Sequence, residues 1–119
     1  MELSRFTTKS REAVHDAQQD ALRREHSAVT PLHLLRALIR DPEGLAKRII
    51  DRAGGDTARL SIDTDRSLDG MARVSGAGVE GRPLAMDTAL SRLLVRASDA
   101  AKELGDDYVS VEHLLMELM

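Results

Sequence analysis

Residues 6–38, FTTKSREAVHDAQQDALRREHSAVTPLHLLRAL, lie over residues 86–118, MDTALSRLLVRASDAAKELGDDYVSVEHLLMEL, at a constant offset of 80 without a gap. Eight positions are identical, and they are the pairs Thr8 and Thr88, Ala17 and Ala97, Ala21 and Ala101, Val29 and Val109, His33 and His113, Leu34 and Leu114, Leu35 and Leu115, and Leu38 and Leu118. Thr30 and Ser110 add a matched helix cap. The repeat predicts two similar helical units within one chain.

Apolar residues recur at steps of three and four along most of the sequence, which is the spacing of amphipathic helices. The pattern predicts six helices, over about residues 7–24, 30–39, 45–53, 56–68, 87–104 and 110–118. Side chains that suit the N-cap position precede them, namely Thr7 or Thr8, Thr30, Asp56 or Thr57, Asp87 or Thr88, and Ser110. We expect the apolar stripe of the fifth helix to run from Leu90 to Leu104, and the fourth helix to be anchored by Leu60, Ile62 and Leu68.

The spacing of these helices suggests how the chain is divided. A first repeat is expected over residues 1–70, a linker rich in glycine over 71–85, and a partial second repeat over 86–119. Two further helices follow the His-Leu-Leu element in the first copy, whereas the second copy stops soon after it, so we interpret the second repeat as truncated. All 119 residues are assigned to one domain.

Composition narrows the possible functions. The chain is 42% hydrophobic but only 2% aromatic, so its core must be built from aliphatic side chains, and the composition favours an all-α fold. Seventeen basic and 20 acidic residues are interspersed and give a net charge of −3, which offers no electrostatic case for nucleic acid. There is no cysteine, no apolar run long enough for a membrane span, and no signal-peptide pattern. We therefore expect a cytoplasmic protein.

Several motifs together resemble the double Clp N-terminal repeat, in the form carried by ClpB-type disaggregase chaperones. The matching residues are Arg5-Phe6-Thr7, Ala17-Gln18, His26-x-x-Val29-x-Pro31-x-His33-Leu34-Leu35, Ala53-Gly54-Gly55-Asp56, and Gly105-Asp106-x-Tyr108-Val109-Ser110-x-Glu112-His113-Leu114-Leu115. The resemblance covers essentially the whole chain. It implies a pseudo-twofold bundle of two four-helix repeats that recognises protein clients and is not itself an enzyme.

The resemblance also implies a binding site and partners. Polar Thr7, Asp106 and Glu112 would border a hydrophobic groove, and apolar Leu90, Leu94 and Tyr108 would line it. Clients would be unfolded or aggregated polypeptides, with an adaptor protein as a further partner and neither nucleic acid nor membrane. ATP and magnesium would bind only in ATPase modules of a homohexameric parent, because no G-x-x-x-x-G-K-[ST] phosphate loop occurs in this chain.

Structural roles compete with each of these assignments. Thr7 also suits the cap of the first helix, and Asp106 and Glu112 also complement the positive end of the sixth helix. The leucines also suit the core. His33 and His113 are expected to pack rather than to bind metal, because neither has a ligand four residues on. Three other functions stay open. The first is the adaptor-docking domain of a ClpC- or ClpA-type unfoldase that feeds a peptidase. The second is a helix-turn-helix reader of DNA, which the balanced charge disfavours, and the third is a stand-alone adaptor or regulator without ATPase modules.

Overall fold

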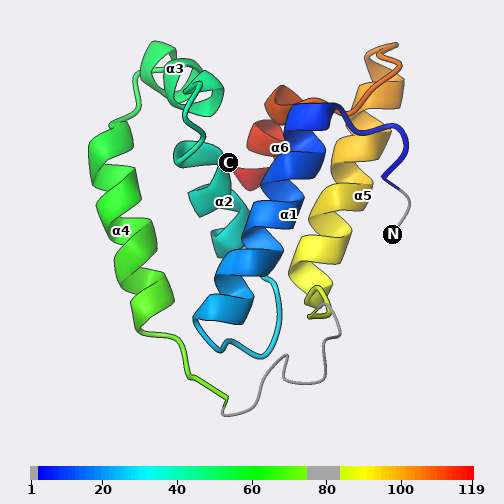
Figure 1. Ribbon diagram of the computed structural model, residues 1–119. Helices are drawn as coiled ribbons and strands as arrows, with labels where there is room; N and C mark the ends of the chain where they lie inside the picture. Colours follow the sequence, from blue (N-terminus) through cyan, green and yellow to red (C-terminus); the bar gives the residue numbers. More distant parts are fainter. Residues whose placement is uncertain (1–2, 75–83) are drawn as a thin grey trace.

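The computed structural model describes residues 3–74 and 84–119 (Figure 1). In this part of the chain the secondary structure consists of helices and two isolated β-bridges. The helices are α1 (Thr8–Arg23), α2 (Pro31–Ile39), α3 (Leu45–Arg52), α4 (Thr57–Asp69), α5 (Thr88–Glu103) and α6 (Val111–Leu118). Their bounds follow the predicted ones closely, and the all-α class is confirmed. Residues 75–83, in the middle of the predicted linker, lie outside the described residues.

The helices begin where the sequence supplies a capping side chain. Thr7, Asp56 and Asp87 are the N-caps of α1, α4 and α5, and each accepts a hydrogen bond from the backbone N–H three residues on. Thr30 and Ser110 are the N-caps of α2 and α6, as predicted. These bonds satisfy N–H groups that have no partner within a helix, so the ends of the elements are determined locally.

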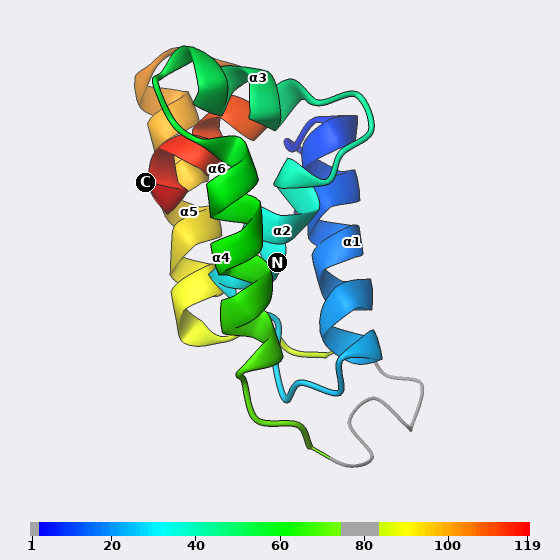
Figure 2. The same ribbon diagram turned by 90° about the vertical axis from the view of Figure 1, so that its left-hand side faces the viewer.

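The two copies of the repeat face each other across a pair of reciprocal backbone contacts. The N–H of Thr7 donates to the carbonyl of Val109 at 3.0 Å, and the N–H of Asp87 donates to the carbonyl of Val29 at 2.9 Å. The offset of 80 residues converts one contact into the other. The helices follow the same relation, since α1 and α5 run in opposite directions (Figure 1), and α2 contacts both and lies between them in the view of Figure 2. A pseudo-twofold axis therefore relates the two copies of the internal repeat.

Identical residues of the repeat form much of the core. Five of the eight identical pairs are buried in both copies, namely Ala17 and Ala97, Ala21 and Ala101, Val29 and Val109, His33 and His113, and Leu34 and Leu114. The alanines lack bulk and so allow α1 to approach α2, and α5 to approach α6. Helix α2 lies centrally and contacts the other five helices. Truncating a buried leucine here would cost about 2–5 kcal/mol of stability.

Two apolar side chains expected in the core lie on the surface. Ile62 is 55% exposed because the buried side of α4 is formed by Thr57, Thr64 and Leu68, and position 62 falls on the opposite side. Leu104 is 61% exposed because it is the C-cap residue of α5, where the chain already leaves the helix. Of the described helices, none has both the length and the apolar character needed to cross a membrane.

Candidate functional site

The N-terminal segment and the loop between α5 and α6, residues 104–110, meet at one end of the molecule (Figure 1, top). The N–H of Val109 donates to the carbonyl of Arg5 at 2.8 Å, next to the bond from Thr7. The Arg5 guanidinium donates to the carbonyls of Asp107 and Asp106, at 3.2 and 3.3 Å. This loop is thus held in place by a segment about a hundred residues earlier in the sequence.

Two large apolar side chains project from this loop into solvent. Tyr108 is 60% exposed and Leu104 is 61% exposed, whereas Val109 and Val111 are buried. Tyr108 points outward because its neighbour Val109 fills the core. We use the name loop surface for this site, and it comprises Thr7, Leu104, Asp106, Tyr108 and Glu112.

The three polar residues of the loop surface differ in how they are bound. Thr7 Oγ1 accepts from the N–H of Ser10 at 3.2 Å, so its role as a helix cap is confirmed. Asp106 Oδ2 accepts from His113 Nε2 at 2.9 Å, while half of the Asp106 side chain stays exposed. Glu112 is exposed in the first turn of α6 and makes no hydrogen bond or ion pair with any residue in the described ranges. Of the two carboxylates, Glu112 is therefore the freer to meet a partner.

Leu90 and Leu94 do not belong to this surface. Their side chains are 1% and 0% exposed and lie in the hydrophobic core, so the prediction that they line a groove is wrong for this structure. Both occupy the inner side of α5, where they pack with the other buried leucines and alanines. Of the six predicted site residues, the structure thus brings Thr7, Asp106, Tyr108 and Glu112 to one end of the molecule.

Sequence reasoning missed Leu104 as a member of the loop surface and Arg5 as the residue that holds its loop. The contact of Arg5 with the loop joins residues that are distant in sequence, so no local pattern announces it. Leu104 continues the apolar spacing of α5 and was for that reason expected inside. The glycine at position 105 was the available signal, because a helix that ends there leaves the preceding side chain at the rim.

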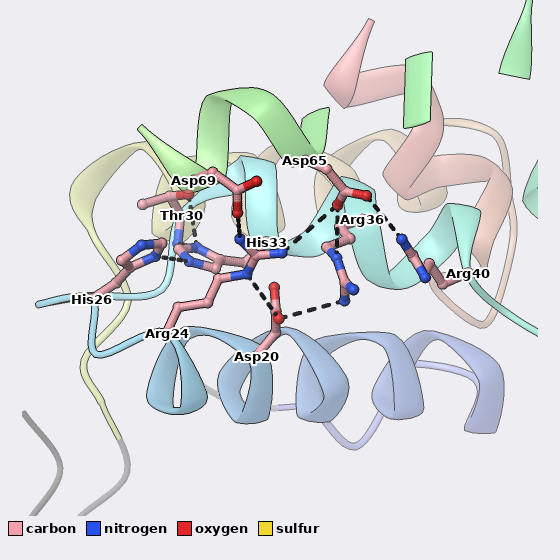
Figure 3. Close-up of polar contacts among 9 residues, drawn as sticks. All are labelled: Asp20, Arg24, His26, Thr30, His33, Arg36, Arg40, Asp65 and Asp69. Atoms are coloured by element: carbon pink, nitrogen blue, oxygen red, sulfur yellow. Dashed lines mark hydrogen bonds and ion pairs between the residues drawn. The ribbon is translucent and has the colours of Figure 1, made fainter. Parts of the chain in front are cut away.

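A second polar cluster joins α1, α2 and α4 (Figure 3). Arg24 contacts Asp20 at 3.1 Å and Asp69 at 2.7 Å. Asp65 accepts hydrogen bonds from Arg36 at 2.9 Å and Arg40 at 2.8 Å. Burial tends to raise the pKa of Asp65, but the hydrogen bonds from Arg40 and Arg36 outweigh it and lower the pKa below its ordinary value. These ion pairs hold α4 against α1 and α2.

The buried histidines of the repeat act as helix caps. His33 Nδ1 accepts from the N–H of Thr30 at 2.9 Å, and His113 Nδ1 accepts from the N–H of Ser110 at 2.9 Å. Each occupies the third position of its helix, where a glutamate or glutamine usually completes a capping box. Both rings are also buried, which agrees with a packing role. No three histidine or carboxylate side chains among the described residues gather as ligands for a metal ion.

The fold and the two-copy architecture define a class of small helical repeat domains, and comparison with known proteins identifies it. Residues 5–119 match the family described as the Clp repeat (R) N-terminal domain. This chain belongs to that family.

Individual relatives agree with the family. The chaperone protein ClpB of Bacillus cereus is 40% identical over 116 residues, which are 98% of this chain and 13% of the relative. The N-terminal domain of Hsp104 from Candida albicans superposes with a TM-score of 0.84 at 22% identity, covering 95% of this chain and 72% of that one. A complex of a ClpV N-domain with a VipB peptide gives a TM-score of 0.80 at 20% identity, covering 98% and 71%. The chain thus spans only a small part of the curated relative's length.

Proposed function

We propose that this chain is the substrate-recognition domain of a ClpB-type, ATP-dependent disaggregating chaperone. It binds unfolded or aggregated polypeptides and passes them to ATPase modules outside this chain. In this proposal the domain has no catalytic activity and no cofactor of its own, and ATP and magnesium act in the parent, which is a cytoplasmic homohexamer. Membership of the Clp repeat family and the ClpB relative support the class of parent.

The loop surface is the observation that carries the proposal. It combines two exposed apolar side chains, Leu104 and Tyr108, with the carboxylates of Asp106 and Glu112. Apolar side chains of a client would lose contact with water against Leu104 and Tyr108, and basic side chains would be attracted to the carboxylates. Such a surface suits extended segments that carry both kinds of residue.

The size of this surface predicts weak binding. Full burial of one large apolar side chain is worth about 1.5–3 kcal/mol, and Leu104 and Tyr108 are already partly covered. Association also costs several kcal/mol in lost translational and side-chain freedom, roughly as much as two such side chains provide. Weak binding agrees with a domain that must accept many sequences and release them again.

The test is binding of a fluorescently labelled, permanently unfolded client of the casein type, followed by anisotropy. Tyr108→Ala should weaken binding about fivefold to tenfold, because covering a side chain that is now 60% exposed is worth on the order of 1–1.4 kcal/mol. Ile62→Ala is the matched control, since Ile62 is 55% exposed but lies on α4. Equal losses in the two variants, or none in Tyr108→Ala, would exclude the loop surface as the client site.

Adaptor docking is the second candidate function. It is favoured by the structural neighbour in which a ClpV N-domain holds a defined VipB peptide. A domain specialised for one adaptor would bind a single segment tightly and would ignore unrelated unfolded chains. The anisotropy experiment decides between the two functions, because adaptor docking predicts no measurable affinity of the unaltered domain for the unfolded client.

A further inference from the structure

His26 and His33, here called the histidine pair, form a buried hydrogen bond in which each ring already uses one nitrogen as an acceptor. His26 Nδ1 lies 2.8 Å from His33 Nε2, and the two side chains are 2% and 0% exposed (Figure 3). Since His33 Nδ1 accepts the N–H of Thr30, the proton of His33 resides on Nε2 and is donated to His26 Nδ1. An added proton must therefore displace a donor, either at His33 Nδ1 or at His26 Nδ1.

The second copy of the repeat carries a different pair at the same two positions. His113 makes the same cap with Ser110, but its Nε2 faces the carboxylate of Asp106, which occupies the position of His26. A carboxylate accepts the Nε2–H of His113 whether the imidazole of His113 is neutral or protonated. Asp106 is also half exposed, whereas His26 is buried. The two copies thus differ in one residue that decides how each responds to protons.

The surroundings of the histidine pair disfavour a positive charge. The pKa of His33 is lowered to about 4, chiefly by burial and also by His26 and Arg24, whereas Asp20 and Asp87 oppose the lowering. Burial also lowers the pKa of His26, and Arg24 and Arg73 add to this effect, whereas Asp20 and the carbonyl of Leu68 oppose it. The charged groups that face the pair therefore come from α1, from the cap of α5 and from the segment after α4.

The loop that contains His26, residues 24–30 between α1 and α2, holds several segments together. The carbonyl of Val29 accepts from the N–H of Asp87 at 2.9 Å, and the N–H of Val29 donates to the carbonyl of Ala85 at 3.0 Å. These bonds attach the loop to the segment that leads into α5. The carbonyl of Glu25 accepts from the N–H of Val74 at 2.7 Å, which attaches the segment after α4. Glu25 has a φ of +59°, which is unfavourable for a residue with a side chain and persists only where neighbours hold it.

We propose that the histidine pair keeps the loop at residues 24–30 closed at neutral pH and releases it in mild acid, while the Asp106–His113 pair keeps the loop at 104–110 closed. Release uncouples the loop from α2, from the end of α4 and from residues 84–87. Buried Val29 and Leu68 then become accessible to solvent and to client segments. Acid would thereby add a second apolar surface, at the end of the molecule opposite the loop surface (Figure 1).

Amide hydrogen exchange at pH 7 and pH 5, corrected for the intrinsic exchange rates, tests this proposal. With one group whose pKa falls from 6.5 to about 4, opening of residues 24–30 should become roughly twentyfold more favourable between these pH values. Residues 104–110 serve as the internal control and should change far less. An unchanged protection of 24–30, or an equal loss in both loops, overturns the proposal.

Exchanging the partner residues between the copies gives the decisive variants. His26→Asp should remove the acid response of residues 24–30, because it installs the pair of the second copy. Asp106→His should introduce an acid response in residues 104–110. If His26→Asp does not fold at pH 7, the result for Asp106→His decides the test by itself. A persistent response in folded His26→Asp, or none in Asp106→His, overturns the proposal. These outcomes are independent of client binding and of the proposed function.

Discussion

Replacing Leu94 by alanine should destabilise the domain strongly without removing a client contact. Leu94 is 0% exposed in the core, so the substitution leaves a cavity and costs about 2–5 kcal/mol. For a chain of this size, each kcal/mol lowers the melting temperature by about 4 °C. We therefore expect the melting temperature to fall by about 8–20 °C.

The repeat supplies a matched control for this variant. Val14 occupies the position of Leu94 in the first copy and is 2% exposed. Val14→Ala removes one carbon fewer, so its loss of stability should be smaller by about 1 kcal/mol. Thermal unfolding followed by circular dichroism measures both variants, and client anisotropy at 10 °C measures binding while the variants remain folded.

The two measurements separate a core residue from a binding residue. If Leu94 is core, the folded Leu94→Ala variant binds the unfolded client as the unaltered domain does. A variant that melts within 2 °C of the unaltered domain but has lost client affinity would refute the argument from burial. Leu94 would then have to be accessible in solution.

Three further predictions concern stability. Since His33 has a pKa of about 4 in the folded state and about 6.5 when unfolded, the unfolded state binds more protons between these values, and urea unfolding should show about 3 kcal/mol lost as pH falls from 7 to 4. Gly105→Ala should cost about 1 kcal/mol in the same assay, because φ is +76° there and no atom lies within 4 Å of the added methyl group. Gain of stability would contradict this. Thr7→Ala should cost about 1 kcal/mol through loss of the α1 cap, and Thr7→Ser should restore most of it.

Local chemistry made the helices predictable from the sequence. Thr7, Thr30, Asp87 and Ser110 were expected as caps and act as caps, because capping depends on residues within one turn. The internal repeat also predicted that the chain contains two similar helical units, because a constant offset means that the same unit occurs twice. The histidine caps were not foreseen, because the usual third residue of a capping box is glutamate or glutamine.

The candidate site was only partly predictable, because exposure depends on contacts between distant segments. Periodicity placed Leu90, Leu94 and Leu104 on one stripe, yet the first two are buried and the third is exposed where α5 ends. Tyr108, predicted to line a groove with Leu90 and Leu94, is exposed, and the Arg5 side chain that supports its loop reaches it through a contact across 102 residues. Helical spacing alone does not distinguish an apolar residue that is buried in the core from one that is exposed at the end of a helix.

The reciprocal contacts between the copies have a consequence for synthesis on the ribosome. Phe6 is 4% exposed in the finished domain and pairs with Val109, so its partner is translated about a hundred residues later. The helices of the first copy can form as they emerge, whereas the backbone bridge of Phe6 forms only after Val109 has been made. Loop closure over such a separation is slow compared with helix formation. The nascent chain therefore passes through a stage in which its first segment has not yet found its backbone partner in the second copy.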